Sequence, residues 1–232
     1  MDNDYLELKN WLDSTADEPL ENMDAFFDAR IAGYEEHMAH WSEHYKWISE
    51  LLPGDITTLL DLGCGTGLEL DTIFARFPEL NVTGIDLSAE MLAELRRKHS
   101  GRLLTLIQAD YFSHDLGENC FDAAVSVETL HHFTARKKIG LFSRINRSLK
   151  PGGVYLECDY IAVTQAIEDL TFSECRRRRL RDQIPSDTYV HFDTPLTLEH
   201  EMAALKAAGF RTVELIGYLP HDNHTPMIRA VK

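Results

Sequence analysis

The sequence predicts an α/β domain built on a seven-stranded, mostly parallel β-sheet with helices on both faces and an antiparallel last strand. Two observations support this prediction. From Thr57 onward, short apolar runs alternate with stretches long enough for helices, which is the order that builds parallel sheets. The chain has 232 residues, of which 44% are hydrophobic, and this suits one domain with a buried core.

The first 54 residues predict a helical segment that precedes the sheet. Residues 1–22 are polar and acidic, and Trp11 and Leu12 are their apolar anchors. Apolar residues then recur at alternating spacings of four and three, which is the pattern of one stripe along a single helix. We expect this helix to end at Pro53 and Gly54. The stripe comprises Phe27, Ile31, Tyr34, Met38, Trp41, Tyr45, Ile48 and Leu52.

Residues 55–160 are expected to alternate between strands and helices. The expected strands are 57–62, 81–87, 102–110, 121–128 and 151–160. The expected helices are 67–77, 88–99 and 135–149, and Ser88 is a good N-cap for the second of them. Because ligands of open α/β sheets bind at the carboxyl ends of the strands, we look for a site there.

The alternation stops at Ile161. Residues 161–184 predict a helical insert, and a proline-containing loop follows up to Pro195. A helix over 197–209, which Gly209 would end, and strands at 211–219 and 226–232 are expected to complete the sheet. The chain thus divides into an N-terminal helical lid (1–54), a core (55–160), an insert (161–195) and a C-terminal helix with two strands (196–232).

The charge of the chain excludes some classes of partner. Its formal net charge is -15, and such a surface repels nucleic acid and anionic lipid. No apolar run approaches the roughly 18 residues that cross a bilayer, and the N-terminus lacks a basic and apolar leader. Four scattered cysteines without a CxxC pair favour reduced thiols. We therefore expect a cytoplasmic protein that binds neither nucleic acid nor membrane.

The segment Asp61-Leu-Gly63-Cys-Gly65-Thr-Gly67 has the composition of a ligand-binding loop. Its glycine spacing does not fit the dinucleotide fingerprint GxGxxG in either register, and no Lys-Ser/Thr pair follows as in a P-loop. A nicotinamide-dependent dehydrogenase is therefore disfavoured. The loop permits close backbone approach to a ligand but lacks the marks of a pyrophosphate or triphosphate site.

Two acidic residues at later strand ends suggest a nucleoside. Asp86 ends the second expected strand about 20 residues after the glycines, where a carboxylate can accept from both ribose hydroxyls. Asp110 ends the third, where a carboxylate can accept from an exocyclic amine such as that of adenine. Together with the glycine loop, they outline a nucleoside site that does not require phosphate.

The segments LLDLGCGTGLE, VTGIDLS, LIQADYF, FDAAVSVETLHHF and LKPGGVYL resemble the successive motifs of class I S-adenosylmethionine-dependent methyltransferases. The resemblance covers roughly Leu59 to Glu157 and implies a Rossmann-like fold with S-adenosyl-L-methionine as the cofactor. Residues 55–160 would then be the cofactor-binding core, and residues 161–195 a cap over the substrate. The motifs are specific for the family and say almost nothing about the acceptor.

The resemblance also implies roles by position. Asp61, Gly63, Gly65 and Gly67 would surround the amino acid part of the cofactor, and Asp86 would hold the ribose. Leu87 would pack beside the adenine, Asp110 would accept from its amino group, and Tyr111 would lie next to the ring. Ser126, Val127 and Glu128 would lie near the methionine and its methyl group. Tyr34 is similar to an aromatic residue that covers the cofactor in many relatives.

Methyl transfer from a sulfonium is an in-line displacement, so alignment and exclusion of water are the main requirements. A base is needed only where the nucleophile must lose a proton. His131 and His132 are the candidate catalytic residues, because histidine titrates near neutral pH. They are alternatively interpreted as residues that cap or pack the turn. His191 is a weaker candidate.

We expect no metal site. His37, His40 and His44 have a spacing that can bind zinc, but they are interpreted as a solvated helix flank. Arg176 to Arg179 are likewise interpreted as a solvated face, although they could attract an anionic substrate or hold a partner.

The predicted function is methyl transfer from S-adenosylmethionine to a small-molecule acceptor, by a monomer or homodimer. Two alternatives remain open. One is a protein that binds S-adenosylmethionine or S-adenosylhomocysteine without catalysis, as a sensor or assembly partner. The other is a methyltransferase that acts on a protein. The first helix and residues 161–195 are expected to determine the acceptor.

Overall fold

The computed structural model describes residues 3–232 and is centred on a seven-stranded sheet with the order β3-β2-β1-β4-β5-β7-β6. Strands β1 to β5 are parallel, whereas β7 lies antiparallel between β5 and β6. The predicted sheet is thereby confirmed. The strands are β1 (Thr58–Leu62), β2 (Asn81–Asp86), β3 (Leu104–Gln108), β4 (Phe121–Val127), β5 (Leu149–Cys158), β6 (Thr212–Gly217) and β7 (Met227–Val231).

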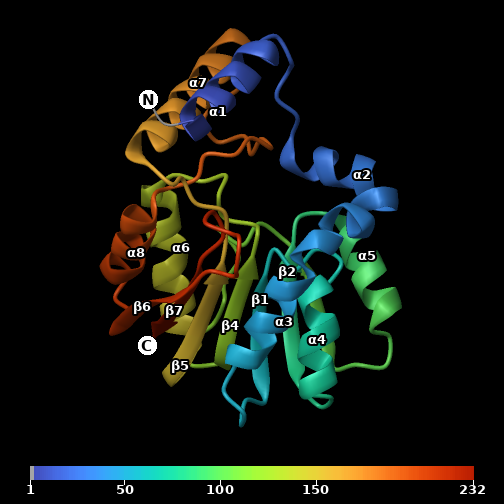
Figure 1. Ribbon diagram of the computed structural model, residues 1–232. Coiled ribbons are helices and arrows are strands. Elements are labelled where there is room, and N and C mark those ends of the chain that lie inside the picture. The colour runs from blue at the N-terminus through green and yellow to red at the C-terminus, as the bar shows by residue number, and fades with distance from the viewer. Residues whose placement is uncertain (1–2) are drawn as a thin grey trace.

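Helices cover both faces of the sheet (Figure 1). Successive strand residues point to opposite faces, so Leu59 and Leu60, both fully buried, belong to different apolar clusters. One face carries α6 and α8, and the other carries α3, α4 and α5. The helices are α1 (Asn3–Ser14), α2 (Met23–Met38), α3 (Ser42–Leu51), α4 (Leu68–Arg76), α5 (Ala89–Lys98), α6 (Ala135–Ser148), α7 (Gln165–Arg181) and α8 (Leu198–Ala207).

The expected single helix over residues 27–52 is wrong. It is divided into α2 and α3 by a short 3₁₀ helix, η1 (Ala39–Trp41). The division lets α3 pack on α4 at the face of the sheet, while α2 runs across the carboxyl ends of the strands (Figure 1). The apolar spacing continues through the break, but the two halves have different neighbours: Phe27 packs against the cluster that includes α6 and α8, whereas Ile48 and Leu52 belong to the cluster that includes α4.

A helical layer formed by α1 and α7 lies above the sheet (Figure 1). Leu12 of α1 is buried against Val190 and Phe192 of the loop that follows α7. Arg178 of α7 is only 3% exposed, and its Nη2 donates to the Leu12 carbonyl and to Thr15 Oγ1. The interpretation of the arginine run as a solvated face is therefore wrong for Arg178, which joins α1 to α7.

Within the described residues, no helix has the length and apolar character that crossing a bilayer requires.

Candidate active site

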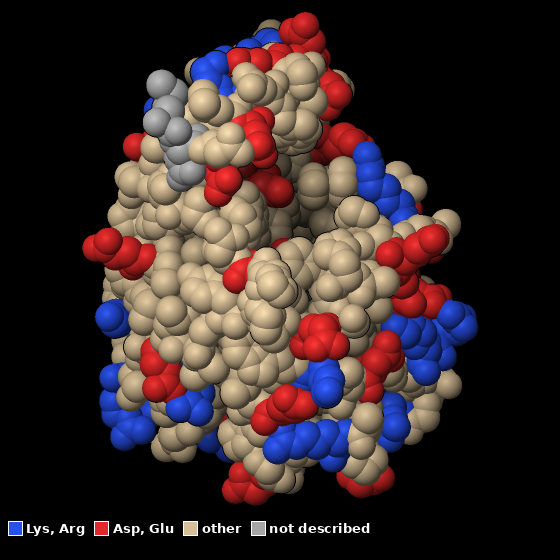
Figure 2. Space-filling view, viewed as in Figure 1, with Lys and Arg blue, Asp and Glu red and all other residues tan. Residues whose placement is uncertain are grey.

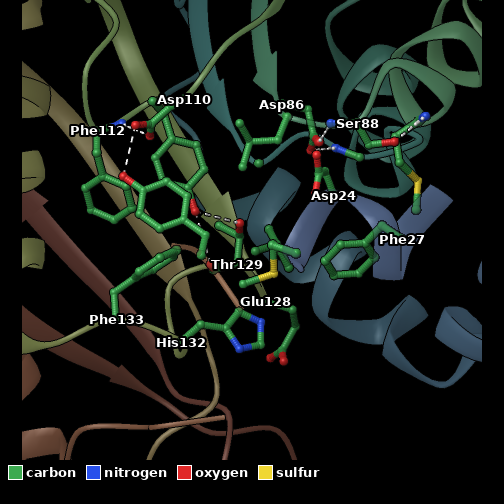
Figure 3. Close-up of a pocket in the computed structure, with 18 of the residues that line it drawn as sticks. Asp24, Phe27, Asp86, Ser88, Asp110, Phe112, Glu128, Thr129, His132 and Phe133 are labelled. Atoms are coloured by element: carbon green, nitrogen blue, oxygen red, sulfur yellow. Dashed lines mark hydrogen bonds between the residues drawn. The ribbon is translucent and has the colours of Figure 1, made fainter. Parts of the chain in front are cut away.

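A pocket lies at the carboxyl ends of β1 to β4, where the sequence predicted a ligand (Figure 3). The glycine loop after β1, the tips of β2 and β3 and the segment after β4 form its floor. Helix α2 closes one side, and Tyr189 of the loop after α7 closes another. Eight predicted cofactor residues line it: Tyr34, Gly63, Gly65, Asp86, Leu87, Asp110, Tyr111 and Val127.

The glycine loop requires residues without a side chain. Gly63 and Gly65 have φ values of 66° and 47°, in the left-handed region that glycine tolerates best. A Cβ at Gly63 would collide with the Thr129 side chain. A Cβ at Gly65 would meet only Tyr34, with its hydroxyl at 3.6 Å, so the backbone there is open to the pocket. Gly67 faces Leu95 and Leu70 instead, and it borders a smaller hollow beside the loop.

Asp86 is held by the main chain. The Gly65 and Ser88 N–H groups donate to its two carboxylate oxygens, each at 2.9 Å. Burial raises the pKa of this carboxyl, and the hydrogen bonds from the main chain oppose that rise. Each oxygen keeps a lone pair for a further donor, which is what recognition of a ribose diol would need.

Asp110 accepts hydrogen bonds both from the segment at its own strand end and from the loop after α7. Its Oδ1 accepts from the Phe112 N–H at 2.8 Å, and its Oδ2 accepts from the Tyr189 hydroxyl at 2.9 Å. Lys137 lies 3.7 Å above the Tyr189 ring. Tyr111 is buried beside this group, and its hydroxyl donates to the Thr129 carbonyl at 3.3 Å.

Three predicted residues lie outside the pocket lining: Gly67, which borders the smaller hollow, and Asp61 and Ser126. Asp61 is 1% exposed behind the glycine loop, next to Glu69 of α4. Ser126 is fully buried, and its hydroxyl bonds the Tyr155 hydroxyl at 2.6 Å, on the core side of β4. Their predicted contacts with the cofactor stay predictions.

Three buried carboxyl groups around the loop fit a cationic ligand. Asp61 Oδ2, Glu69 Oε1 and Glu128 Oε1 have no hydrogen-bond partner within the described residues. Burial raises the pKa of all three, and that of Glu128 reaches about 8. A cation beside them would restore the ionised form. S-adenosylmethionine has two positive groups, its amino group and its sulfonium, so the residues present fit this cofactor.

The candidate catalytic histidines lie next to the pocket. His131 Nδ1 is 2.6 Å from Asp159 Oδ1, and this carboxylate also accepts from the Leu130 N–H. Burial disfavours the imidazolium, but Asp159 and the nearby Asp193 outweigh it and raise the pKa of His131 to about 9. The His132 side chain is 3% exposed, and it lines the pocket. His191 stacks on Phe26 with ring centroids 3.4 Å apart, and burial lowers its pKa to about 4.

A second cavity adjoins the pocket and has a volume of about 740 Å³, within the range of small-molecule sites. It lies between α2, η1 and the loop after α7, and it shares Phe27, Tyr34, Glu128 and His132 with the pocket. Its walls combine apolar groups such as Met38 and Trp41 with a set of histidines: His37, His40, His131, His132 and His191.

The three histidines of the first helical segment have different surroundings. His37 and His40 are exposed, as the solvated flank predicted, and their ring centroids lie 5.9 Å apart. His44 is 6% exposed and its Nε2 lies 2.9 Å from Asp222 Oδ2 in the loop before β7. The expectation of a solvated flank is wrong for His44, because this loop returns across α3.

Sequence reasoning did not include Tyr189, Phe27 or Thr129 in the site, and it left Glu128 without a charge-pairing role. Tyr189 contacts a residue 79 positions away, which no local pattern indicates. Glu128 did carry a signal, because an acid that directly follows a buried strand lies at the edge of the sheet where ligands bind.

A methyltransferase domain family matches residues 59–153 of the chain. The cypemycin N-terminal methyltransferase of a Streptomyces species is 32% identical over 68% of this chain and 69% of that protein. A sterol 24-C-methyltransferase of Gibberella zeae is 28% identical over 79% of this chain and 45% of that protein. The chain thus spans about half the length, or less, of the sterol methyltransferases that it matches.

Solved methyltransferases share the fold. Human N-acetylserotonin methyltransferase in complex with S-adenosylmethionine has a TM-score of 0.60 and 19% identity, over 83% of this chain and 52% of that chain. The S-adenosylmethionine-dependent methyltransferase SibL has a TM-score of 0.63 and 17% identity, over 84% of this chain and 56% of that chain. The family match, the cypemycin relative and this fold agree with one another. The chain belongs to the class I S-adenosylmethionine-dependent methyltransferases, and S-adenosyl-L-methionine is its cofactor.

Proposed function

We propose that the chain transfers a methyl group from S-adenosylmethionine to a small-molecule acceptor bound in the second cavity. The observation that carries this proposal is the connection of the two spaces through Phe27, Tyr34, Glu128 and His132. An acceptor in the second cavity would lie directly beside the methionine end of the pocket. The names of the relatives mention different acceptors (a sterol, cypemycin, N-acetylserotonin), so similarity alone selects none of them.

Within this proposal, Asp86 binds the ribose hydroxyls and Asp110 accepts from the adenine amino group, with Leu87 and Tyr111 against the ring. Gly63, Gly65 and Gly67 leave room for the amino acid part, with Asp61 and Glu69 behind them. Tyr34 covers the methionine region beside Val127 and Ser126. When bound, the cofactor supplies an electrophilic methyl carbon on a sulfonium.

The residues of the chain would then serve alignment and exclusion of water. Helix α2 and the loop after α7 cover the pocket, and both also border the second cavity. A well-oriented nucleophile gains a large rate advantage from position alone. No base is part of the proposal, because displacement at a sulfonium needs one only where the acceptor must lose a proton.

Methylation of a panel of small molecules, followed by mass spectrometry of the products and measurement of S-adenosylhomocysteine, tests the proposal. A methylated small molecule is the expected result. Failure to bind S-adenosylmethionine at millimolar concentration would contradict the proposal. Cofactor binding without turnover of any acceptor class would favour the sensor alternative, and methylation confined to proteins would favour a protein acceptor.

Replacing Glu128 by glutamine should weaken S-adenosylmethionine binding about tenfold, or about 1.4 kcal/mol, and leave S-adenosylhomocysteine binding nearly unchanged. The reason is that only the former carries the sulfonium charge, and Glu128 Oε1 is buried at the junction of the two spaces with no hydrogen-bond partner within the described residues. Isothermal titration calorimetry with both ligands measures the difference.

Glu69→Gln is the matched control for this prediction. Glu69 lies on the other side of the glycine loop, where the amino group common to both ligands is proposed to bind. Glu69→Gln should therefore weaken the binding of both ligands by the same factor. If Glu128→Gln lowered the affinity for both ligands equally, this would show that Glu128 does not pair with the sulfonium.

A further inference from the structure

We propose that His131, His132 and Asp193 form a binding site for a divalent metal ion, best suited to Zn²⁺, at the wall of the second cavity. All three residues line that cavity. The metal site goes beyond the proposed methyl transfer, and its test does not need the methylation reaction.

The spacing of the three side chains is that of metal ligands. His131 Nε2 lies 3.5 Å and His132 Nδ1 lies 3.3 Å from the same atom, Asp193 Oδ1. The three candidate ligand atoms are all within 4.8 Å of one another. Zinc bonds of about 2.0–2.1 Å place neighbouring ligands of a tetrahedral site roughly 3.3–3.4 Å apart. Two of the three ligand pairs are therefore close to this separation, and the third pair lies within 4.8 Å.

One buried polar atom of this cluster has no hydrogen-bond partner within the described residues. The His132 side chain is 3% exposed, yet its Nδ1 has no hydrogen-bond partner within the described residues. Buried polar atoms are normally paired, so an unpartnered imidazole nitrogen 3.3 Å from a carboxylate oxygen requires an explanation. A cation bound to both atoms explains the arrangement, because the cation accepts a lone pair from the imidazole nitrogen and one from the carboxylate oxygen.

A carboxylate that would orient one of the proposed ligands is also present. His131 Nδ1 lies 2.6 Å from Asp159 Oδ1, and the Asp159 side chain is 3% exposed. Metal-bound histidines commonly donate their other ring N–H to a carboxylate, which fixes the tautomer and the ring orientation. The Thr194 N–H donates to the His131 carbonyl at 2.8 Å, which ties the loop carrying Asp193 to the segment after β4.

Access and charge favour a cation. The Asp193 side chain is 49% exposed, so an ion can enter from solvent. Acidic side chains gather around the hollow below the α1–α7 layer (Figure 2), in a chain with a net charge of -15. Three protein ligands leave one position open toward the cavity, as in zinc sites that accept an external ligand. That position suits an oxygen or nitrogen donor, either of water or of an acceptor.

The test is titration of the untagged, chelator-treated full chain with Zn²⁺ by calorimetry, and with Co²⁺ by visible absorption. We expect one ion per chain and the spectrum of four-coordinate Co²⁺. Asp193→Asn and His132→Asn should each weaken binding at least about tenfold, and Asp159→Asn about 10–100-fold. Asp193 is half exposed, so Asp193→Asn should remain folded, which thermal denaturation verifies.

Two matched variants exclude other sites. Asp187→Asn removes an exposed acid from the same loop, and His40→Asn removes a ring of the exposed His37–His40 pair that borders the same cavity. Both should bind Zn²⁺ as the unmodified chain does. The proposal is overturned if the unmodified chain binds no Zn²⁺, if Asp193→Asn and His132→Asn leave binding unchanged, or if His40→Asn abolishes it.

Discussion

Replacing Asp86 by alanine should weaken binding of S-adenosylmethionine and of S-adenosylhomocysteine by about 100-fold or more. Hydrogen bonds to a charged group contribute about 1.5–3 kcal/mol each, and Asp86 is proposed to accept one from each of the two ribose hydroxyls. Both ligands contain the ribose, so both should lose affinity equally, in contrast to the Glu128 variant. Isothermal titration calorimetry is the measurement.

Asp86 also accepts from the Gly65 and Ser88 N–H groups, so its removal could disturb the glycine loop itself. Asp86→Asn retains the shape of the side chain and one acceptor oxygen. Its affinity for both ligands should therefore lie between that of the alanine variant and that of the unmodified chain. Glu90→Ala, at an exposed position in the first turn of α5, is the control that should bind normally. An affinity of Asp86→Ala within twofold of the unmodified chain would refute the ribose assignment.

The substitution Lys138→Met should lower the free energy of unfolding by about 3–5 kcal/mol, a large part of the stability of a typical domain. Lys138 Nζ lies 2.6 Å from Glu201 Oε2, and the side chains are 0% and 2% exposed between α6 and α8. Glu157 is buried in the same group, and neither of its carboxyl oxygens has a partner within the described residues. Without Lys138, Glu201 would keep a buried charge with no counter-ion. Urea denaturation measures the loss.

The double variant Lys138→Met/Glu201→Gln should recover most of this stability, because it removes both charges. Lys46→Met makes the same change in an exposed pair, where Lys46 lies 3.9 Å from Glu50, and should alter stability by less than about 1 kcal/mol. If Lys138→Met lowered the free energy of unfolding no more than Lys46→Met does, the buried ion pair would stabilise the fold no more than a surface pair.

The parts of the fold that depend on local pattern could be predicted. The apolar runs that became β1, β2 and β4 are buried on both faces, so their composition alone indicates parallel strands. Asp86 and Asp110 could be placed in one pocket because the carboxyl ends of neighbouring parallel strands meet at one edge of the sheet. The position of the glycine loop beside the pocket could be predicted from the spacing of its glycines.

The remaining features depend on contacts between distant segments. The break between α2 and α3 at Ala39–Trp41 lies within a regular apolar spacing, so the spacing does not reveal it. The break changes the neighbours against which each helix packs. Arg178 is buried because α1, more than 160 positions earlier, supplies its acceptors. Asp193 reaches His131 and His132 only because the loop after α7 folds back over β4. One sequence carries no periodic signal for such pairings.

The hydrogen bond between Tyr189 and Asp110 has a consequence for how the two ligands affect each other's binding. If Asp110 accepts from adenine, the cofactor must share this acceptor with Tyr189 or displace it. The same loop carries His191 and Asp193 into the wall of the second cavity. Occupancy of the two spaces is then linked, and by thermodynamic reciprocity each ligand changes the affinity of the other by the same factor. Calorimetry should accordingly show that bound S-adenosylmethionine changes the affinity of the acceptor, and that bound acceptor changes the affinity of S-adenosylmethionine by the same factor.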